Sequence, residues 1–126
     1  MKIGLLPFYL KLYDDTLPET RAGVEAFRRL VANEFTKRGA GVIDAPICRV
    51  GTEFDAAVDI IEKEGADAIV TLHLAYSPSG ESIGALMRTK LPIIVLDTTP
   101  DYSFDCGADP SAIMYNHGIH GVQDMC

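Results

Sequence analysis

The residues best suited to chemistry lie in one segment near the C-terminus, from Tyr115 to Asp124. Two of the three histidines, His117 and His120, occur there, and Asn116 precedes them. On a helix of about 3.6 residues per turn, His117, His120 and Asp124 would share one face. Such a face suits a ligand that forms hydrogen bonds. It equally suits histidines that are merely solvated at the surface, and the spacing alone leaves both interpretations open.

The same segment gives little support for a metal site. At about 1.5 Å of rise per residue, His117 and Asp124 would be separated by about 10 Å along a helix, too far to bind one ion together. His120 with Asp124 would supply only two ligands. The cysteines are three in number and widely spaced, without the close pairs of a thiolate site. We therefore assign no metal ligand and no catalytic residue to this chain.

Length and composition predict a single α/β domain over residues 1–126. A chain of 126 residues buries about two thirds of its unfolded surface, which is enough for a core without disulfides. The net charge of −7, without a basic stripe, argues against nucleic acid and anionic membranes as partners. No apolar run approaches the ~20 residues of a membrane span, and the N-terminus is not typical of a signal peptide. We expect a cytoplasmic protein.

Short apolar runs alternate with helical patterns along the chain. The expected strands cover residues 2–6, 41–45, 67–72 and 92–97, the first of them ending at Pro7. Thr16 with Glu19 has the form of a capping box before one helix, and Thr52 is the expected cap of the next. A third helix should point Ile83, Leu86 and Met87 inward, and a final one should begin at Asp109.

This alternation predicts a three-layer flavodoxin-like (Rossmann-like) fold, with a parallel sheet of order 2-1-3-4 and helices on both faces. The first strand is not followed by GxGxxG, and no GxxxxGK[ST] occurs, which argues against dinucleotide and nucleoside-triphosphate sites. A fifth strand is missing from the expected sheet, and the last helix reaches Cys126 without a stop signal. We therefore expect the N-terminal fragment of a larger protein.

In open parallel sheets, ligands bind beyond the carboxyl ends of the strands, at the point where the strand order reverses. Here that point lies between the first and third strands. Residues 8–15 and 73–80 should converge on it, and the loop after the fourth strand could join them together with the segment that carries His117 and His120. The candidate binding residues in these segments are Lys11, Tyr13, His73, Tyr76, Asn116, His117 and His120. Aromatic faces combined with imidazole and amide groups suit sugar recognition, although the aromatic residues of 8–15 could equally pack over the sheet.

Three segments resemble parts of the N-terminal domain of the L-arabinose/L-fucose isomerase family. Asn116 to Gly121 resembles that family's Asn-x-x-x-His-Gly segment, and Leu72 to Pro78 resembles its Leu-His-aromatic-Ser-Pro segment with one extra residue. Leu12-Tyr13 followed by Pro18-Glu19-Thr20 is similar to its Leu-Tyr-Gly-Pro-Glu-Thr opening, with an insertion. The likeness spans nearly all of this chain but only the first part of such an enzyme.

The resemblance implies an Mn²⁺-dependent aldose–ketose isomerase whose metal ligands and acid–base groups lie in later domains. It implies a homo-oligomer in which this domain places His120 against the sugar in a neighbouring subunit's site. Asn116 would support the turn, and Tyr76 would form part of the wall around the sugar. His117 stands where arabinose isomerases carry Gln, so the resemblance does not name the sugar.

Under this interpretation, the isolated chain should be inactive and should not bind Mn²⁺ tightly. The main alternative is a free-standing flavodoxin-like domain that binds a small molecule or signals without catalysis. A metal-dependent hydrolase built on His117 and His120 is a further, less favoured one.

Overall fold

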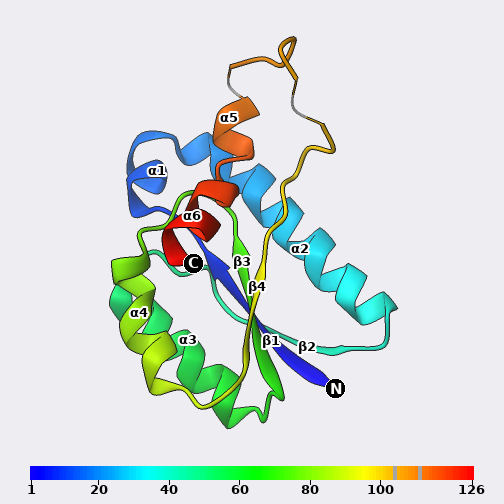
Figure 1. Cartoon of the computed structure of the whole chain (residues 1–126), viewed down its shortest axis with the longest axis vertical. Coiled ribbons are helices and arrows are strands. Elements are labelled where there is room, and N and C mark those ends of the chain that lie inside the picture. Colours follow the sequence, from blue (N-terminus) through cyan, green and yellow to red (C-terminus); the bar gives the residue numbers. More distant parts are fainter. Residues whose placement is uncertain (104, 111) are drawn as a thin grey trace.

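The computed structural model describes residues 1–103, 105–110 and 112–126, and its centre is one parallel sheet (Figure 1). The strand order is β2-β1-β3-β4, which confirms the predicted order. The strands are β1 (Lys2–Phe8), β2 (Gly41–Asp44), β3 (Ala68–His73) and β4 (Ile93–Leu96). The helices are α1 (Lys11–Thr16), η1 (Pro18–Thr20, a 3₁₀ helix), α2 (Arg21–Lys37), α3 (Gly51–Lys63), α4 (Ser79–Arg88), α5 (Ala112–Tyr115) and α6 (Gly118–Met125).

Helices cover both faces of the sheet, as predicted for a flavodoxin-like fold. On one face, Val24 and Val31 of α2 pack against buried residues of β1 and β3 such as Leu5 and Leu72. On the other face lie α3 and α4, whose apolar residues join a second cluster that includes Ile69 of β3. Because both faces of β1 and β3 are buried, these strands are apolar almost throughout.

β1 is longer than expected, because Pro7 does not end it. Pro7 lies in register with Leu72 of β3, and its carbonyl accepts a hydrogen bond of 2.9 Å from the N–H of Cys48. A proline lacks only the N–H donor, so it is tolerated where the strand needs no bond from that nitrogen. Residues 8–15, which the sequence indicates as a long connection after the first strand, are not one loop, since Phe8 belongs to β1 and α1 begins at Lys11.

The two expected threonine caps do not form. The Thr16 hydroxyl donates to the Leu12 carbonyl at 2.7 Å within α1, and α2 begins only after η1, without a side-chain cap. At α3, the first residue is Gly51, and its N–H donates to Oε2 of Glu81 at 2.8 Å. A carboxylate from a neighbouring helix thus satisfies the first backbone donor of α3.

The inward face of α4 also differs from the prediction. Ile83 and Met87 are exposed, whereas Ser82, Ala85 and Leu86 are buried. Small side chains at two of these positions let α4 pack closely against the rest of the core, so the larger Ile83 and Met87 face outward. The final predicted helix is likewise interrupted, and the chain forms α5 and α6 with Asn116 and His117 between them.

In the described part of the chain, no helix combines the length and the apolar character needed to cross a bilayer.

We expect Gly4→Ala to lower the free energy of unfolding by about 1–3 kcal/mol, as overpacking of a core does. A Cβ at position 4 would lie 2.3 Å from Cγ2 of Ile61, a fully buried side chain that cannot move away freely. Urea unfolding followed by circular dichroism measures the change.

Gly84→Ala is the matched control, because a Cβ at that position in α4 meets nothing within 4 Å. The alanine should raise the free energy of unfolding by about 0.5–1 kcal/mol through its higher helix propensity. Equal stability of the Gly4→Ala variant and the parent would show that the contact between β1 and α3 is looser than described.

Candidate functional site

An aromatic cluster of Tyr13, Tyr76, His117 and His120 lies beyond the carboxyl ends of β1 and β3. Oη of Tyr13 and Nδ1 of His117 are 2.8 Å apart and form a hydrogen bond. The ring centroid of His117 lies 5.9 Å from that of Tyr76 and 4.7 Å from that of His120. The structure therefore brings together four of the candidate residues, and Figure 1 shows α1 and α6 at the same end of the sheet.

The central pair of this cluster is uncharged at neutral pH. Burial, with a smaller contribution from Tyr9, raises the pKa of Tyr13. Burial, with a smaller contribution from the charge of His120, lowers the pKa of His117. When the Tyr13 hydroxyl donates to Nδ1, the proton of the neutral His117 ring sits on Nε2, which is then a hydrogen-bond donor.

His73 lies beneath α6 rather than at the surface. It is the last residue of β3, only 2% exposed, and its ring stacks on Phe8 with centroids 4.4 Å apart. Neither ring nitrogen has a hydrogen-bond partner among the described residues. Burial, only partly opposed by the charge of Asp97, lowers the pKa of His73 to about 4. This histidine is therefore neutral and is covered by the segment that carries His117 and His120.

Two glycines allow α6 to lie directly on the end of β3. A Cβ at Gly118 would be 2.0 Å from the carbonyl oxygen of His73. A Cβ at Gly121 would be 2.9 Å from Nδ1 of His73 and 3.1 Å from the carbonyl oxygen of Ala75. Any larger residue would have to push the helix away, so these glycines position the histidines of the aromatic cluster.

Asp124 lies one turn after His120 on α6, but it does not join the aromatic cluster, and the helical face predicted for all three residues is not continuous. His117 precedes α6 as its N-cap residue, because the helix is interrupted there. Oδ2 of Asp124 accepts a hydrogen bond of 2.7 Å from the N–H of Ser79, and that bond lowers the pKa of Asp124. Asp124 thus ties α6 to the first residue of α4.

Lys11, another candidate binding residue, makes its contact outside the aromatic cluster. Its Nζ lies 2.7 Å from Oδ2 of Asp15 in an exposed ion pair along α1. Such a pair leaves the ammonium group on the outer side of α1, and within the described residues no contact joins it to the aromatic cluster.

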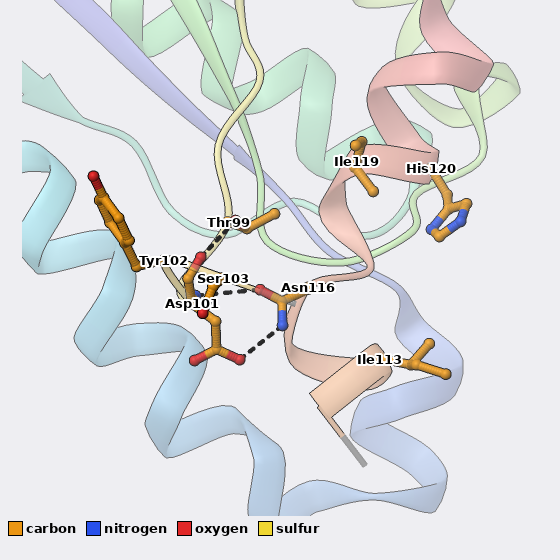
Figure 2. Close-up of a pocket in the computed structure, with 8 residues that line it drawn as sticks. All are labelled: Thr99, Asp101, Tyr102, Ser103, Ile113, Asn116, Ile119 and His120. Carbon is orange, nitrogen blue, oxygen red and sulfur yellow. Dashed lines mark hydrogen bonds between the residues drawn. The ribbon is translucent and has the colours of Figure 1, made fainter. Parts of the chain in front are cut away.

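A pocket of about 520 Å³ opens next to the aromatic cluster, between the segment after β4 and the final two helices (Figure 2). The residues that line the pocket are Thr99, Asp101, Tyr102, Ser103, Ile113, Asn116, Ile119 and His120. Figure 2 shows Asn116 pointing towards Asp101, with His120 on the far side of the pocket from Tyr102. Asn116 Nδ2 donates to Oδ2 of Asp101 at 2.8 Å, and the N–H of Asp101 donates to Oδ1 of Asn116 at 3.2 Å.

The sequence indicated Asn116, His120 and the loop after the fourth strand, but it did not single out Asp101 and Tyr102 within that loop. Asp101 and Tyr102 belong to an irregular segment without periodicity, so no strand or helix pattern drew attention to them. The available signal was topological: the segment after β4 must leave the same end of the sheet as the segments after β1 and β3.

The described residues do not fit a metal centre. Across residues 1–103, 105–110 and 112–126, no three His, Cys, Asp or Glu side chains come close enough together to hold an ion. A Mn²⁺ site of the kind implied by the isomerase resemblance is therefore not formed by these side chains, and we derive no reaction step through a metal.

Comparison of the sequence with models of protein families gives no match, and comparison with curated proteins gives none either. The chemistry of the site therefore rests on its own geometry. Imidazole, amide and phenol groups surround an open pocket, together with one carboxylate, from Asp101. Such groups donate and accept hydrogen bonds and can orient a polar ligand.

We expect Gly121→Ala to displace α6 from β3 and to lower the free energy of unfolding by about 1–3 kcal/mol. The added methyl group would meet His73, Ala75 and Ser77 at once. Urea unfolding measures the loss, and the NMR signals of the His73 ring should shift. Gly80→Ala is the control, since a Cβ there meets nothing within 4 Å; equal losses in both variants would contradict close packing at position 121.

His73 should make the fold sensitive to mild acid. Its pKa in the folded chain, about 4, lies below the ordinary 6.5, so folding favours the neutral ring. The resulting stability is fully present above pH 6.5 and is lost as the pH falls towards 4. A shift of this size corresponds to on the order of 3 kcal/mol.

His73→Gln removes the titrating group. We subtract the free energy of unfolding of the variant from that of the parent, both measured by urea unfolding. This difference should be lower at pH 4 than at pH 7 by that amount, because only the parent loses stability when His73 is protonated. Contributions from other titrating groups cancel in this difference. Parallel pH profiles of the two proteins would show that His73 is not held neutral by burial.

Proposed function

We propose that this chain binds a sugar at the pocket and serves as the substrate-contributing, oligomerising domain of a cytoplasmic aldose–ketose isomerase similar to the L-arabinose and L-fucose isomerases. The observation that supports this most directly is the position of His120 and Asn116. Both line the pocket, and His120 also belongs to the aromatic cluster, where its ring contacts that of His117. These two residues belong to the segment in which the resemblance to that family is most specific.

The groups around the pocket match the chemistry of a sugar. The hydroxyl groups of a sugar both donate and accept hydrogen bonds. The imidazole, amide and carboxylate groups around the pocket together offer both donors and acceptors. The C–H faces of a sugar ring pack on aromatic and aliphatic surfaces, which Tyr102, Ile113 and Ile119 supply. A volume of about 520 Å³ lies within the usual range for small-molecule sites.

The role of this domain in such an isomerase is to position the substrate. A hydrogen bond from His120 to a sugar hydroxyl would hold the substrate in one orientation, which accelerates a reaction without bond making by the residue itself. The groups that move the proton, and any metal, would belong to other domains or to a neighbouring subunit. On this proposal, the 126-residue chain alone has no isomerase turnover.

A sugar panel tests the proposal. L-Arabinose, L-fucose and the ketoses L-ribulose and L-fuculose are added to the chain, and binding is measured by saturation-transfer NMR. We expect at least one sugar to bind weakly. His120→Ala should weaken that binding by about tenfold, the effect of losing roughly 1.4 kcal/mol of hydrogen bonding.

Gln123→Ala is the matched control, because Gln123 is exposed on α6 and does not line the pocket. It should leave the affinity unchanged. Absence of binding to all four sugars, or equal binding by the His120→Ala variant, would refute the sugar site. Turnover of any of them by the isolated chain with Mn²⁺ would refute the purely positioning role.

A further inference from the structure

Asn116 lines the pocket, but the protein itself already engages its amide group. Its Nδ2 donates to Oδ2 of Asp101 at 2.8 Å and to the carbonyl oxygen of Ala112 at 2.9 Å. Its Oδ1 accepts a hydrogen bond of 3.2 Å from the N–H of Asp101. An amide nitrogen carries two N–H donors, so Asn116 has no donor left for a ligand.

Asp101 is held firmly, yet its carboxylate keeps free acceptor positions. Besides its two bonds to Asn116, which Figure 2 shows as dashed lines, its carbonyl oxygen accepts from Oγ1 of Thr99 at 3.0 Å. A carboxylate offers roughly four acceptor positions, and Asn116 occupies one of them, at Oδ2. Oδ1 has no partner among the described residues. Because Asp101 is exposed and lines the pocket, a ligand can reach this carboxylate.

His120 provides a second free polar group, from a different element. It belongs to α6, and within the described part of the chain its ring contacts His117 without a hydrogen bond. The pocket therefore presents an acceptor from the segment after β4 and an imidazole from α6. A ligand with several hydroxyl groups can bond to both residues at once, one hydroxyl to each.

We propose that Asp101 contacts the sugar by accepting a hydrogen bond from one of its hydroxyl groups, and that Asn116 is a positioning residue that acts through Asp101. This inference rests on the proposed sugar site. A hydrogen bond to a charged acceptor is about twice as strong as one between neutral groups. Holding the carboxylate in place beforehand lowers the entropy cost of binding, because the segment after β4 needs no further ordering.

Asp101→Asn separates the charge of this residue from its position. The new amide oxygen can still accept from Asn116, so the segment should stay in place, whereas the negative charge is lost. We expect about tenfold weaker binding of whichever of L-arabinose, L-fucose, L-ribulose and L-fuculose the parent binds best, as measured by saturation-transfer NMR. Asp97→Asn is the matched control, since it makes the same charge change in the same segment but does not line the pocket. It should leave the affinity unchanged.

A double-variant cycle tests whether Asn116 acts through Asp101. Asn116→Ala alone should weaken binding by about tenfold, because the carboxylate is no longer held. Combined with Asp101→Ala, it should cause no loss beyond that of Asp101→Ala alone, because no carboxylate remains to be positioned. Losses that add would show that Asn116 bonds to the sugar itself and would overturn its positioning role.

The side-chain amide signals of Asn116 in NMR spectra test the same role without changing Asn116. In Asp101→Ala these signals should shift, and the amide protons should exchange faster with water, because one of their acceptors is gone. Unchanged signals would likewise overturn the positioning role.

The failure of this inference and that of the proposed function give different results. A parent chain that binds none of the four sugars refutes the sugar site and, with it, the contact from Asp101. A parent chain that binds a sugar with an affinity that Asp101→Asn and Asp101→Ala leave unchanged keeps the sugar site and overturns the role of Asp101 alone.

Discussion

The arrangement of the candidate site depends on how closely α6 approaches the end of β3. Gly118 and Gly121 leave no side chain between the helix and His73, and the His73 ring is held flat against Phe8. Because that ring is neutral, the helix covers it without burying a charge, which would be far more costly. This packing places His117 and His120 beyond the ends of the central strands, where Tyr13 and Tyr76 meet them.

Much of the fold could be predicted, because burial on both faces leaves a clear signature in β1 and β3. Apolar runs bounded by turns gave the four strands, and their alternation with helices gave the order. Helix starts were not predictable, because local patterns do not reveal distant partners: the donor at Gly51 is satisfied by Glu81, thirty positions away. The face of α4 was misjudged for a similar reason, since close packing there uses Ser82 and Ala85 rather than Ile83.

The candidate site was predictable only where a topological rule applied. The rule for parallel sheets places Tyr13, Tyr76, His117 and His120 at one end of the sheet, and the structure brings them together. The rule does not predict how each side chain is oriented. Lys11 forms an ion pair with Asp15, and Asp124 accepts a hydrogen bond from the Ser79 amide. Buried His73 illustrates the same limit, because a position at a strand end does not determine whether a helix covers it.

The hydrogen bond between Tyr13 and His117 joins residues 104 positions apart. Closing so long a loop requires nearly the whole chain to be ordered first, so in folding this bond should form late, after the strands have paired. The converse holds for opening: α5 and α6 can detach by breaking few contacts while the sheet stays intact, as low-stability units of proteins do. The aromatic cluster would then be completed in the last step of folding and would be the first part of the site to come apart.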